Sequence, residues 1–281
     1  MSNDQTKENN RLLLEYAGCT DKGQLREENQ DYFKAGEGRW LWEPGYLFVV
    51  ADGVGGNRGG AVASHLAVES FFERFSELMA EIKPAACLQL SFEAAHQALR
   101  VRGEAELEVR GMATTLVAAY CAHNRVYIGS VGDSRLLLLR KGGLNRLTKD
   151  HSLVNERLEQ GLISISEAPF SPYSHVITRA VGKAETIKPD FFEEDLEEGD
   201  WLVLCTDGVY RELSDEEIVQ LVTSSPDAQS ASGMLVDAAN KAGGHDNITA
   251  LVVRVVKLGK VEPLTSNSDT EQITGLPKKD N

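Results

Sequence analysis

Basic residues are fewer than acidic residues in this sequence. Twenty-nine lysine and arginine residues stand against 43 aspartate and glutamate residues, so the 281-residue chain has a formal net charge of −14 at pH 7. Nucleic acids and anionic lipid surfaces attract basic proteins through their phosphate groups. We therefore expect no nucleic acid and no membrane as partner, and a nuclease activity is disfavoured for the same reason. An anionic substrate would need local cations to hold it.

Cysteine and long apolar runs are scarce as well. The four cysteine residues form no CxxC pair and lie in largely apolar segments, which excludes zinc-finger spacing and is typical of reduced thiols in a core. No apolar run approaches the roughly 18 residues that span a bilayer, and residues 1–10 lack the apolar centre of a signal peptide. The sequence thus predicts a cytoplasmic protein with a disordered leader over residues 1–10 and a disordered tail over residues 259–281.

Residues 11–258 contain enough apolar sequence for one large domain. Two strand clusters that each carry a pair of helices predict an α+β fold, a four-layer α-β-β-α sandwich of two antiparallel sheets flanked by helices. Three strands joined by short turns are expected to form a meander within one sheet, at residues 114–122, 125–131 and 135–140. The other strands are expected at residues 12–20, 46–52, 200–209 and 247–256, and the helices after Gly60, Pro84 and Ser214 and over residues 228–242.

Aspartate residues recur where the predicted strands begin or end. Asp52 follows the apolar run in VVADGVGG, and Asp207 repeats this pattern in VLCTDGV. Asp133 lies in the turn GSVGDSR, Asp246 precedes the strand in GGHDNITALVV, and Asp31 ends the polar sequence REENQD. If the two sheets pack face to face, these strand ends can meet at one rim of the sandwich. The sequence therefore predicts a cluster of carboxylates.

Such a cluster needs a compensating charge. Like charges at one rim repel, so either a cation must bind between them or a carboxylate must hold a proton. Hard divalent ions with oxygen ligands meet this need, and the lack of a histidine-rich cluster favours Mg²⁺ or Mn²⁺ over zinc. Glycine follows both Asp52 and Asp207, which lets a backbone carbonyl reach a metal ion and leaves room for its waters. A single Asp-Gly turn is weak evidence, whereas the ordered set is much more specific.

A family resemblance rests on eight stretches in a fixed order. They are TDKGQLREENQD, VVADGVGGNRGG, GMATTLV, VGDSRLLLLR, LTKDHS, ITRAVG, LCTDGV and GGHDNITALVV. From about Tyr16 to Val256 the chain resembles the metal-dependent Ser/Thr protein phosphatases of the PP2C (PPM) family in their compact bacterial form. The resemblance implies hydrolysis of phosphoserine and phosphothreonine in proteins by a hydroxide that bridges two divalent metal ions, Mn²⁺ or Mg²⁺.

The resemblance also implies a set of metal ligands in this sequence. Asp52 would bridge the two core ions, and Gly53 would offer its backbone carbonyl. Asp207 and Asp246 would complete the shell of the first ion. A third, looser ion would be held by Asp133 together with Asp207.

Other residues are implied to act around these ions. Asp31 would hydrogen-bond a metal-bound water, and Arg26 would clamp the substrate phosphate, for which a planar guanidinium group is suited. Gln30 stands where the family often has a carboxylate, which predicts weaker binding of the second ion. Asn247 is expected to brace the Asp246 loop through side-chain hydrogen bonds.

The proton donor and the flap are less well defined. Val54 stands where some relatives carry a histidine that is credited as a general acid, so the leaving group would need a proton from a metal-bound water or another residue. His151 is a conceivable donor, although a structural role in positioning a loop is the stronger interpretation. Residues 152–176 lie where the family carries a flap, and their prolines and mixed composition fit a loop beside the active site.

Two kinds of function remain open on this fold. The first is an enzyme acting on phosphorylated Ser/Thr proteins, with a cognate Ser/Thr kinase and its targets as the expected partners and a monomer as the expected state. The alternative is a catalytically weak or inactive phosphoprotein-binding module. Gln30 favours the alternative, whereas the presence of Asp52, Asp207 and Asp246 together favours the enzyme.

Overall fold

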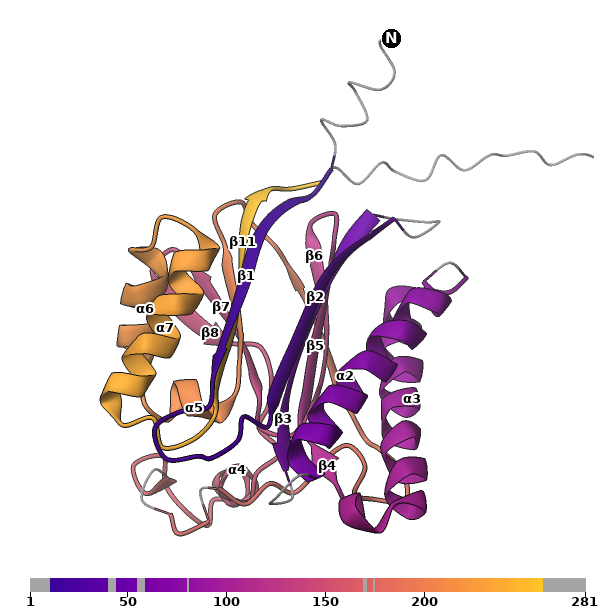
Figure 1. Cartoon of the computed structure of the whole chain (residues 1–281). Helices are drawn as coiled ribbons and strands as arrows, with labels where there is room; N and C mark the ends of the chain where they lie inside the picture. Colours follow the sequence, from indigo (N-terminus) through magenta and orange to yellow (C-terminus); the bar gives the residue numbers. More distant parts are fainter. Residues whose placement is uncertain are drawn as a thin grey trace, which may run out of the picture.

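Two antiparallel β-sheets lie face to face in the computed structural model, which describes residues 11–39, 44–54, 59–79, 81–168, 171–173 and 175–259 (Figure 1). One sheet has the strand order β1-β11-β10-β7-β8, with β1 Leu13–Asp21, β7 Arg135–Arg140, β8 Gly143–Arg146, β10 Trp201–Cys205 and β11 Ile248–Lys257. The other has the order β2-β3-β5-β6-β9, with β2 Asp31–Arg39, β3 Pro44–Val54, β5 Leu116–Ala122, β6 Arg125–Val131 and β9 Asp190–Asp195. A short strand, β4 Ala113–Thr114, pairs with β3 in the second sheet.

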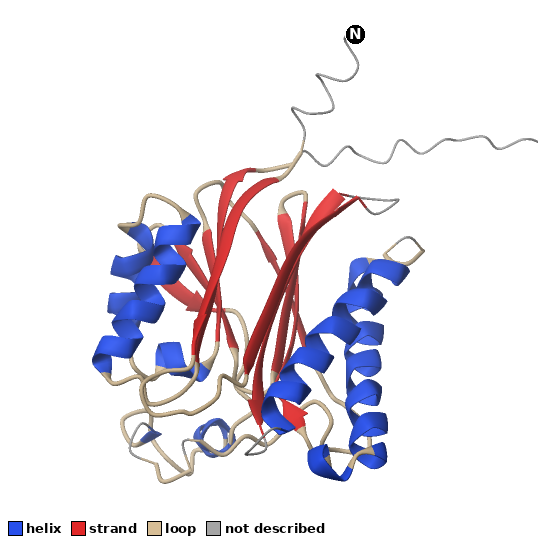
Figure 2. Ribbon diagram, in the orientation of Figure 1, coloured by secondary structure: helices blue, strands red, loops and turns tan. Residues whose placement is uncertain are grey.

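Helices cover the outer face of each sheet (Figure 2). The second sheet is covered by α2 Gly59–Leu78 and α3 Pro84–Ala105, and a 3₁₀ turn, η1 Leu107–Val109, follows them. The first sheet is covered by α5 Asp207–Tyr210, α6 Asp215–Thr223 and α7 Ala228–Ala242. A further helix, α4 Leu153–Glu159, lies at one end of the sandwich. The predicted four-layer α-β-β-α sandwich is therefore confirmed.

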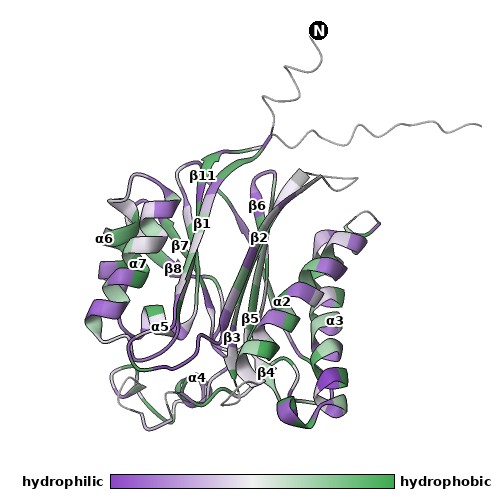
Figure 3. Cartoon of the chain, in the orientation of Figure 1, coloured by the Kyte–Doolittle hydropathy of each residue, from purple (hydrophilic) through white to green (hydrophobic). Residues whose placement is uncertain are grey.

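Successive side chains of each strand point to opposite faces of its sheet, as the period of two in a β-strand requires. One face packs against helices and the other against the opposite sheet. In β3, Val49 packs under α2 and α3, whereas Val50 packs between the two sheets. In β10, Leu204 lies between the sheets, whereas Val203 packs under α6 and α7. The helices show both hydrophobic and hydrophilic residues, as expected for elements with one buried face (Figure 3). Three apolar layers thus fix both sheets relative to their helices.

One prediction about sheet topology is wrong. The strands β5 and β6 pair with each other as expected, but β7 leaves this sheet and pairs with β10 in the other one. The chain crosses between the sheets just after Val131, where Gly132 adopts a φ of 102°, a left-handed conformation that glycine tolerates at little cost. Asp133 lies in this crossing segment. The departure from a meander therefore places Asp133 between the sheets.

The predicted leader and most of the predicted tail, residues 1–10 and 260–281, lie outside the described residues. Gly259, assigned to the tail from sequence, is buried, and its N–H donates a hydrogen bond to the carbonyl of His123 (3.1 Å). The folded part thus continues at least to this residue. Within the described ranges, none of the helices is long and apolar enough to cross a membrane.

Candidate metal centre

Five aspartate residues meet at the end of the sandwich where α4 and α5 lie (Figure 1). Asp31 is the first residue of β2, and it pairs in register with Asp52 near the end of β3. Asp133 follows β6, Asp207 opens α5 directly after β10, and Asp246 precedes β11. Because neighbouring strands run antiparallel, the beginning of one and the end of the next fall at the same rim. The structure brings these residues together: Asp31 and Asp52 are paired in register, and Asp133 and Asp207 both form ion pairs with Arg211.

Asp31 joins the two sheets. Its Oδ2 accepts hydrogen bonds from the hydroxyl groups of Thr206 (2.8 Å) and Thr249 (2.7 Å), both from the opposite sheet. Its Oδ1 is buried and has no hydrogen-bond partner among the described residues. Burial raises the pKa of Asp31 to about 7 although the two threonine hydroxyl groups pull it down. Close to neutral pH this carboxyl group is therefore able to hold a proton or face a cation.

Asp52 is fixed through its backbone. Its N–H donates to Thr115 Oγ1 (2.9 Å), and its carbonyl accepts from Thr114 Oγ1 (2.7 Å). The side chain is half-buried. Its pKa is raised well above the ordinary value, first by burial and then by the charges of Asp31, Asp207, Asp133 and Asp246. The charge of every other aspartate in the cluster thus acts on Asp52.

Asp133 and Asp207 both form ion pairs with the side chain of Arg211. Arg211 places its Nε 2.8 Å from Asp207 Oδ2 and its Nη2 3.4 Å from Asp133 Oδ2. Burial and the neighbouring Asp133 raise the pKa of Asp207 to about 7, although Arg211 opposes the shift. Burial also raises the pKa of Asp133, again against Arg211. Asp207 Oδ1 remains buried and without a hydrogen-bond partner in the described part of the chain.

Asp246 is paired with Arg26. The distance from Arg26 Nη2 to Asp246 Oδ2 is 2.7 Å, and the Arg26 side chain is 54% exposed. The neighbouring Asn247 fixes the loop that carries Arg26: its Oδ1 accepts from the N–H of Gln30 (2.9 Å), and its Nδ2 donates to the carbonyl of Glu28 (2.9 Å). The side chain of Asn247 therefore ties the Asp246 loop to the loop before β2.

Close backbone packing explains two of the glycine residues. A Cβ atom on Gly53 would collide with the carbonyl of Gly60 at the start of α2, and one on Gly208 would collide with the carbonyl of Asn247. Neither position needs a positive φ. The glycine residues after Asp52 and Asp207 thus let backbones approach each other beneath the carboxylates, a constraint that the sequence interpretation had not included.

The donor set fits a divalent cation. Two buried carboxylate oxygens have no hydrogen-bond partner among the described residues, and burial raises the pKa of several neighbouring carboxyl groups. Within the same residues, no three histidine, cysteine, aspartate or glutamate side chains already surround one point as metal ligands. Carboxylate oxygens are the ligands that Mg²⁺ and Mn²⁺ prefer.

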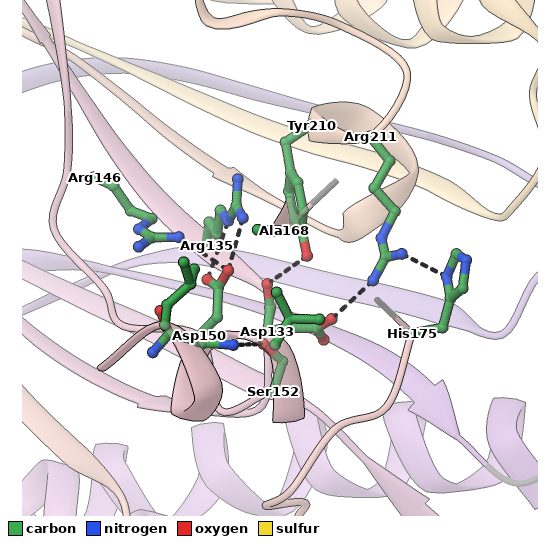
Figure 4. A pocket seen from close by; sticks show the side chains of 12 residues that line it. Asp133, Arg135, Arg146, Asp150, Ser152, Ala168, His175, Tyr210 and Arg211 are labelled. Atoms are coloured by element: carbon green, nitrogen blue, oxygen red, sulfur yellow. Dashed lines mark hydrogen bonds and ion pairs between the residues drawn. The ribbon is translucent and has the colours of Figure 1, made fainter. Parts of the chain in front are cut away.

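A pocket of about 480 Å³ adjoins the cluster (Figure 4). Asp133 and Arg211 line this pocket, together with Asn155, Leu158 and His175 from the segment 152–176. The base of this segment is closed by a bridge between Ser152 and Ile177. The segment predicted to be a flap therefore lies beside the carboxylates.

His151 is occupied by structural contacts. Its Nδ1 accepts from the N–H of Gly132 (3.1 Å), and its Nε2 lies 3.1 Å from Asp190 Oδ2. The ring is buried, which is the main cause of its lowered pKa. Of the two interpretations from sequence, these contacts favour positioning of the turn that carries Asp133 over donation of a proton to a substrate.

The sequence profile of the family described as Protein phosphatase 2C matches residues 22–240. The chain belongs to the protein phosphatase 2C family. It is 35% identical over 237 residues to the serine/threonine phosphatase stp of Listeria monocytogenes serotype 4b (strain F2365), an alignment that covers 83% of this chain and 93% of the relative. The PP2C identity inferred from eight sequence stretches is confirmed.

Solved structures of PP2C-type phosphatases are similar to this chain throughout the described fold. The Mycobacterium tuberculosis serine/threonine phosphatase PstP/Ppp superimposes with a TM-score of 0.80 at 32% identity, covering 88% of this chain and all of that one. The catalytic domain of PstP in complex with two manganese ions superimposes with a TM-score of 0.75 at 32% identity, with coverage of 88% and 100%. Metal ions therefore occur in a PP2C structure of this shape.

Sequence reasoning missed several residues of this PP2C centre. Thr206 and Thr249, which hold Asp31, carry no signal in the sequence, because their partner lies on the other sheet. Arg211 had a readable signal: it stands four residues after Asp207, the spacing at which side chains on a helix meet. His175, which contacts Arg211 from the segment 152–176, depends on the path of a loop and could not be placed.

Proposed function

We propose that this chain is a metal-dependent protein-serine/threonine phosphatase. The observation that carries the proposal is the cluster of Asp31, Asp52, Asp133, Asp207 and Asp246 at one rim, within a PP2C domain. Five carboxylates in a partly buried site repel one another strongly, and divalent ions offset this repulsion. The names of the relatives, which are serine/threonine phosphatases, support phosphoserine and phosphothreonine as the substrate groups.

Two ions are proposed for the core of the site. Asp52 would face both ions, the carbonyl of Gly53 would be a further ligand, and Asp207 and Asp246 would complete the first ion's shell. The PstP complex with two manganese ions supports Mn²⁺, with Mg²⁺ as the other candidate. When bound, such a pair would supply the activation of a bridging water for in-line attack on phosphorus and neutralise charge that develops there. Asp31 would accept a hydrogen bond from a water through its unpartnered Oδ1.

Arg26 is the proposed phosphate clamp. Its guanidinium group lies at the exposed mouth of the site and pairs with Asp246. A substrate phosphate would offer this group a second anionic partner with bidentate geometry, and would draw it from the carboxylate as a metal ion binds there. Asn247 positions Arg26 by holding the loop from which it projects.

Gln30 bears on the strength of the second metal site. Its side-chain amide packs against Gly60 at the start of α2, and its backbone carbonyl accepts a hydrogen bond from the N–H of Gly53 (3.0 Å). A neutral amide contributes a dipole where a carboxylate would contribute a charge, so we propose that the second ion binds more weakly than the first. Phosphorylated proteins, a cognate kinase and its targets remain the proposed partners, and a monomer remains a prediction.

The experiment that tests the function is phosphate release from a phosphothreonine peptide in Mn²⁺, Mg²⁺ and EDTA. We expect turnover that requires a divalent ion and falls by roughly 100-fold or more in Asp207→Asn, because an anionic ligand is lost. Asp195→Asn is the matched control, since Asp195 lies on β9 in a surface ion pair with Arg125. Equal hydrolysis in EDTA would refute the proposal. Tight phosphopeptide binding without turnover would instead support the alternative of a binding module.

A further inference from the structure

Arg211 occupies the space between two carboxylates that the family resemblance assigns to a third metal ion. Its Nε lies 2.8 Å from Asp207 Oδ2, and its Nη2 lies 3.4 Å from Asp133 Oδ2. A single guanidinium group therefore makes ion pairs with both. Figure 4 shows the side chain of Arg211 reaching Asp133 on one side and His175 on the other.

The contact is sheltered from water. The side chains of Asp133, Asp207 and Arg211 are 7%, 11% and 22% exposed. In such surroundings opposite charges attract, and like charges repel, more strongly than they do in water. A divalent ion bound to the same two carboxylates would lie within a few Å of the guanidinium charge. The two cations therefore compete for one position.

The surrounding residues hold Arg211 in this position. Its Nη1 donates to His175 Nδ1, which comes from the segment 152–176. The neighbouring Tyr210 donates its hydroxyl hydrogen to the carbonyl of Asp133 (3.0 Å), so α5 is tied directly to the turn that carries Asp133. The guanidinium group of Arg135 stacks on the Tyr210 ring at 3.4 Å from its centroid. Moving the Arg211 side chain out would break its contacts with Asp207 in its own helix and with Asp133 and His175 from two other segments.

We propose that Arg211 takes the place of a third divalent ion in this protein. The residues Asp133 and Asp207 do not fit a third metal site, because an arginine one helical turn after Asp207 already lies between their carboxylates and forms ion pairs with both. The proposal rests on the function proposed above and refines it: two ions form the complete metal complement. Asp133 then serves as an anchor for Arg211 rather than as a metal ligand.

The test is the number of Mn²⁺ ions bound per chain, measured by equilibrium dialysis with elemental analysis on the full-length protein. We expect two ions for the wild type up to millimolar Mn²⁺. Arg211→Gln should bind three, with the third site at least about tenfold tighter than any third binding in the wild type. Arg146→Gln is the matched control, since Arg146 lines the same pocket but pairs with Asp150 (2.9 Å), and it should bind two.

A double substitution identifies where the gained ion binds. Asp133→Asn combined with Arg211→Gln should return the count to two, because the new site needs both carboxylates. Three ions in the wild type, or unchanged Mn²⁺ isotherms in Arg211→Gln, would overturn the proposal. If Arg211→Gln does not fold, as judged by circular dichroism, Arg211→Met serves instead, and the wild-type count alone still decides.

Failure of this inference is distinguishable from failure of the proposed function. A wild-type protein that binds two or three Mn²⁺ ions and hydrolyses a phosphothreonine peptide retains the function whatever Arg211 does. A wild-type protein that binds no Mn²⁺ refutes both. Counting ions does not depend on turnover, so a slow substrate cannot mask the result.

Discussion

Asp31 and Asp52 stand directly opposite each other across the antiparallel pairing of β2 and β3. Like charges in opposed positions destabilise a sheet pair, so such a pair is unexpected in a structural role alone. The two threonine hydroxyl groups that hold Asp31 from the other sheet keep the carboxyl in place despite the repulsion. The fold thus maintains an electrostatic conflict at its rim, which a proton or a cation relieves.

The first prediction concerns the pH dependence of the metal-free protein. Burial raises the folded-state pKa of Asp31 to about 7, against about 3.9 for an aspartate in an unfolded chain. A raised folded pKa means that the folded state binds the proton more tightly, so this contribution to stability is complete below about pH 4 and is lost as the pH rises through about 7. We expect the thermal midpoint in EDTA to fall between about pH 5 and pH 8.

Asp31→Asn should reduce the slope of that dependence, because the amide does not titrate, whereas Asp207, whose pKa burial also raises to about 7, continues to titrate. Asp195→Asn on the surface of β9 serves as the control and should keep the wild-type slope. Saturating Mn²⁺ should raise the midpoint most at the alkaline end, where the carboxylates are charged. Parallel curves for the wild type and Asp31→Asn would show that Asp31 does not contribute to the pH dependence.

A second prediction compares two glycine residues. A Cβ on Gly53 would collide with the backbone of Gly60 and Gln30, whereas one on Gly233 in α7 would meet nothing within 4 Å. Gly53→Ala should therefore destabilise the protein by about 1–3 kcal/mol through overpacking, and weaken Mn²⁺ binding by displacing Asp52. Gly233→Ala should stabilise it by about 0.5–1 kcal/mol, since alanine is the better helix former. Urea unfolding of both variants measures these stability changes. Equal unfolding midpoints for Gly53→Ala and Gly233→Ala would contradict the prediction.

Local sequence patterns predicted most of the fold. The apolar run before Asp52 gives β3, and Ser214 with Glu217 gives the capping box that opens α6, because both signals lie within a few residues of the structure that they specify. The crossing at Asp133 was missed because strand pairing is decided by long-range packing. The sequence could show that β7 is a strand, but it did not reveal which sheet β7 would join.

The candidate site was also predicted in part from local sequence patterns. The aspartate residues at strand ends were found because each lies in a local motif, and one rim collects them once the sheets are stacked. Of the arginine side chains that pair with these carboxylates, only one was identified from the sequence. Arg26 was assigned by resemblance, but its pairing with Asp246 depends on a loop that Asn247 holds in place. Arg211 was missed because the sequence predicted a strand over residues 200–209, whereas the structure begins α5 at Asp207 and so gives Asp207 and Arg211 helical spacing.

A third prediction follows from the contacts of Asn247. Its side chain makes three hydrogen bonds to the backbone of the loop before β2, at Lys22, Glu28 and Gln30. Asn247→Ala leaves those groups unpaired and should cost about 2–3 kcal/mol, at about 1 kcal/mol for each bond. Turnover should fall as well, because Arg26 loses its support. Asn145→Ala on exposed β8 is the control for removal of an amide and should change neither quantity.

Unfolding in urea gives the stability change, and phosphothreonine hydrolysis at saturating Mn²⁺ gives the turnover. The two readouts separate a general loss of stability from a local effect on the loop. If Asn247→Ala lowers the unfolding free energy yet keeps wild-type turnover at a temperature where it is folded, the loop does not depend on Asn247 for its active position.

The last prediction concerns Arg26, which we expect to act on substrate binding and on metal binding in opposite directions. Arg26→Gln removes a charged hydrogen-bond donor from the phosphate, an interaction worth about 1.5–3 kcal/mol, so KM for a phosphothreonine peptide should rise by roughly 10- to 100-fold with kcat little changed. The same change releases Asp246 from its ion pair and should tighten Mn²⁺ binding.

Arg74→Gln, in a surface ion pair with Glu77 on α2, is the matched control. A fall confined to kcat would place Arg26 in the transition state rather than at the entrance, and unchanged Mn²⁺ affinity would show that its pairing with Asp246 does not compete with the metal.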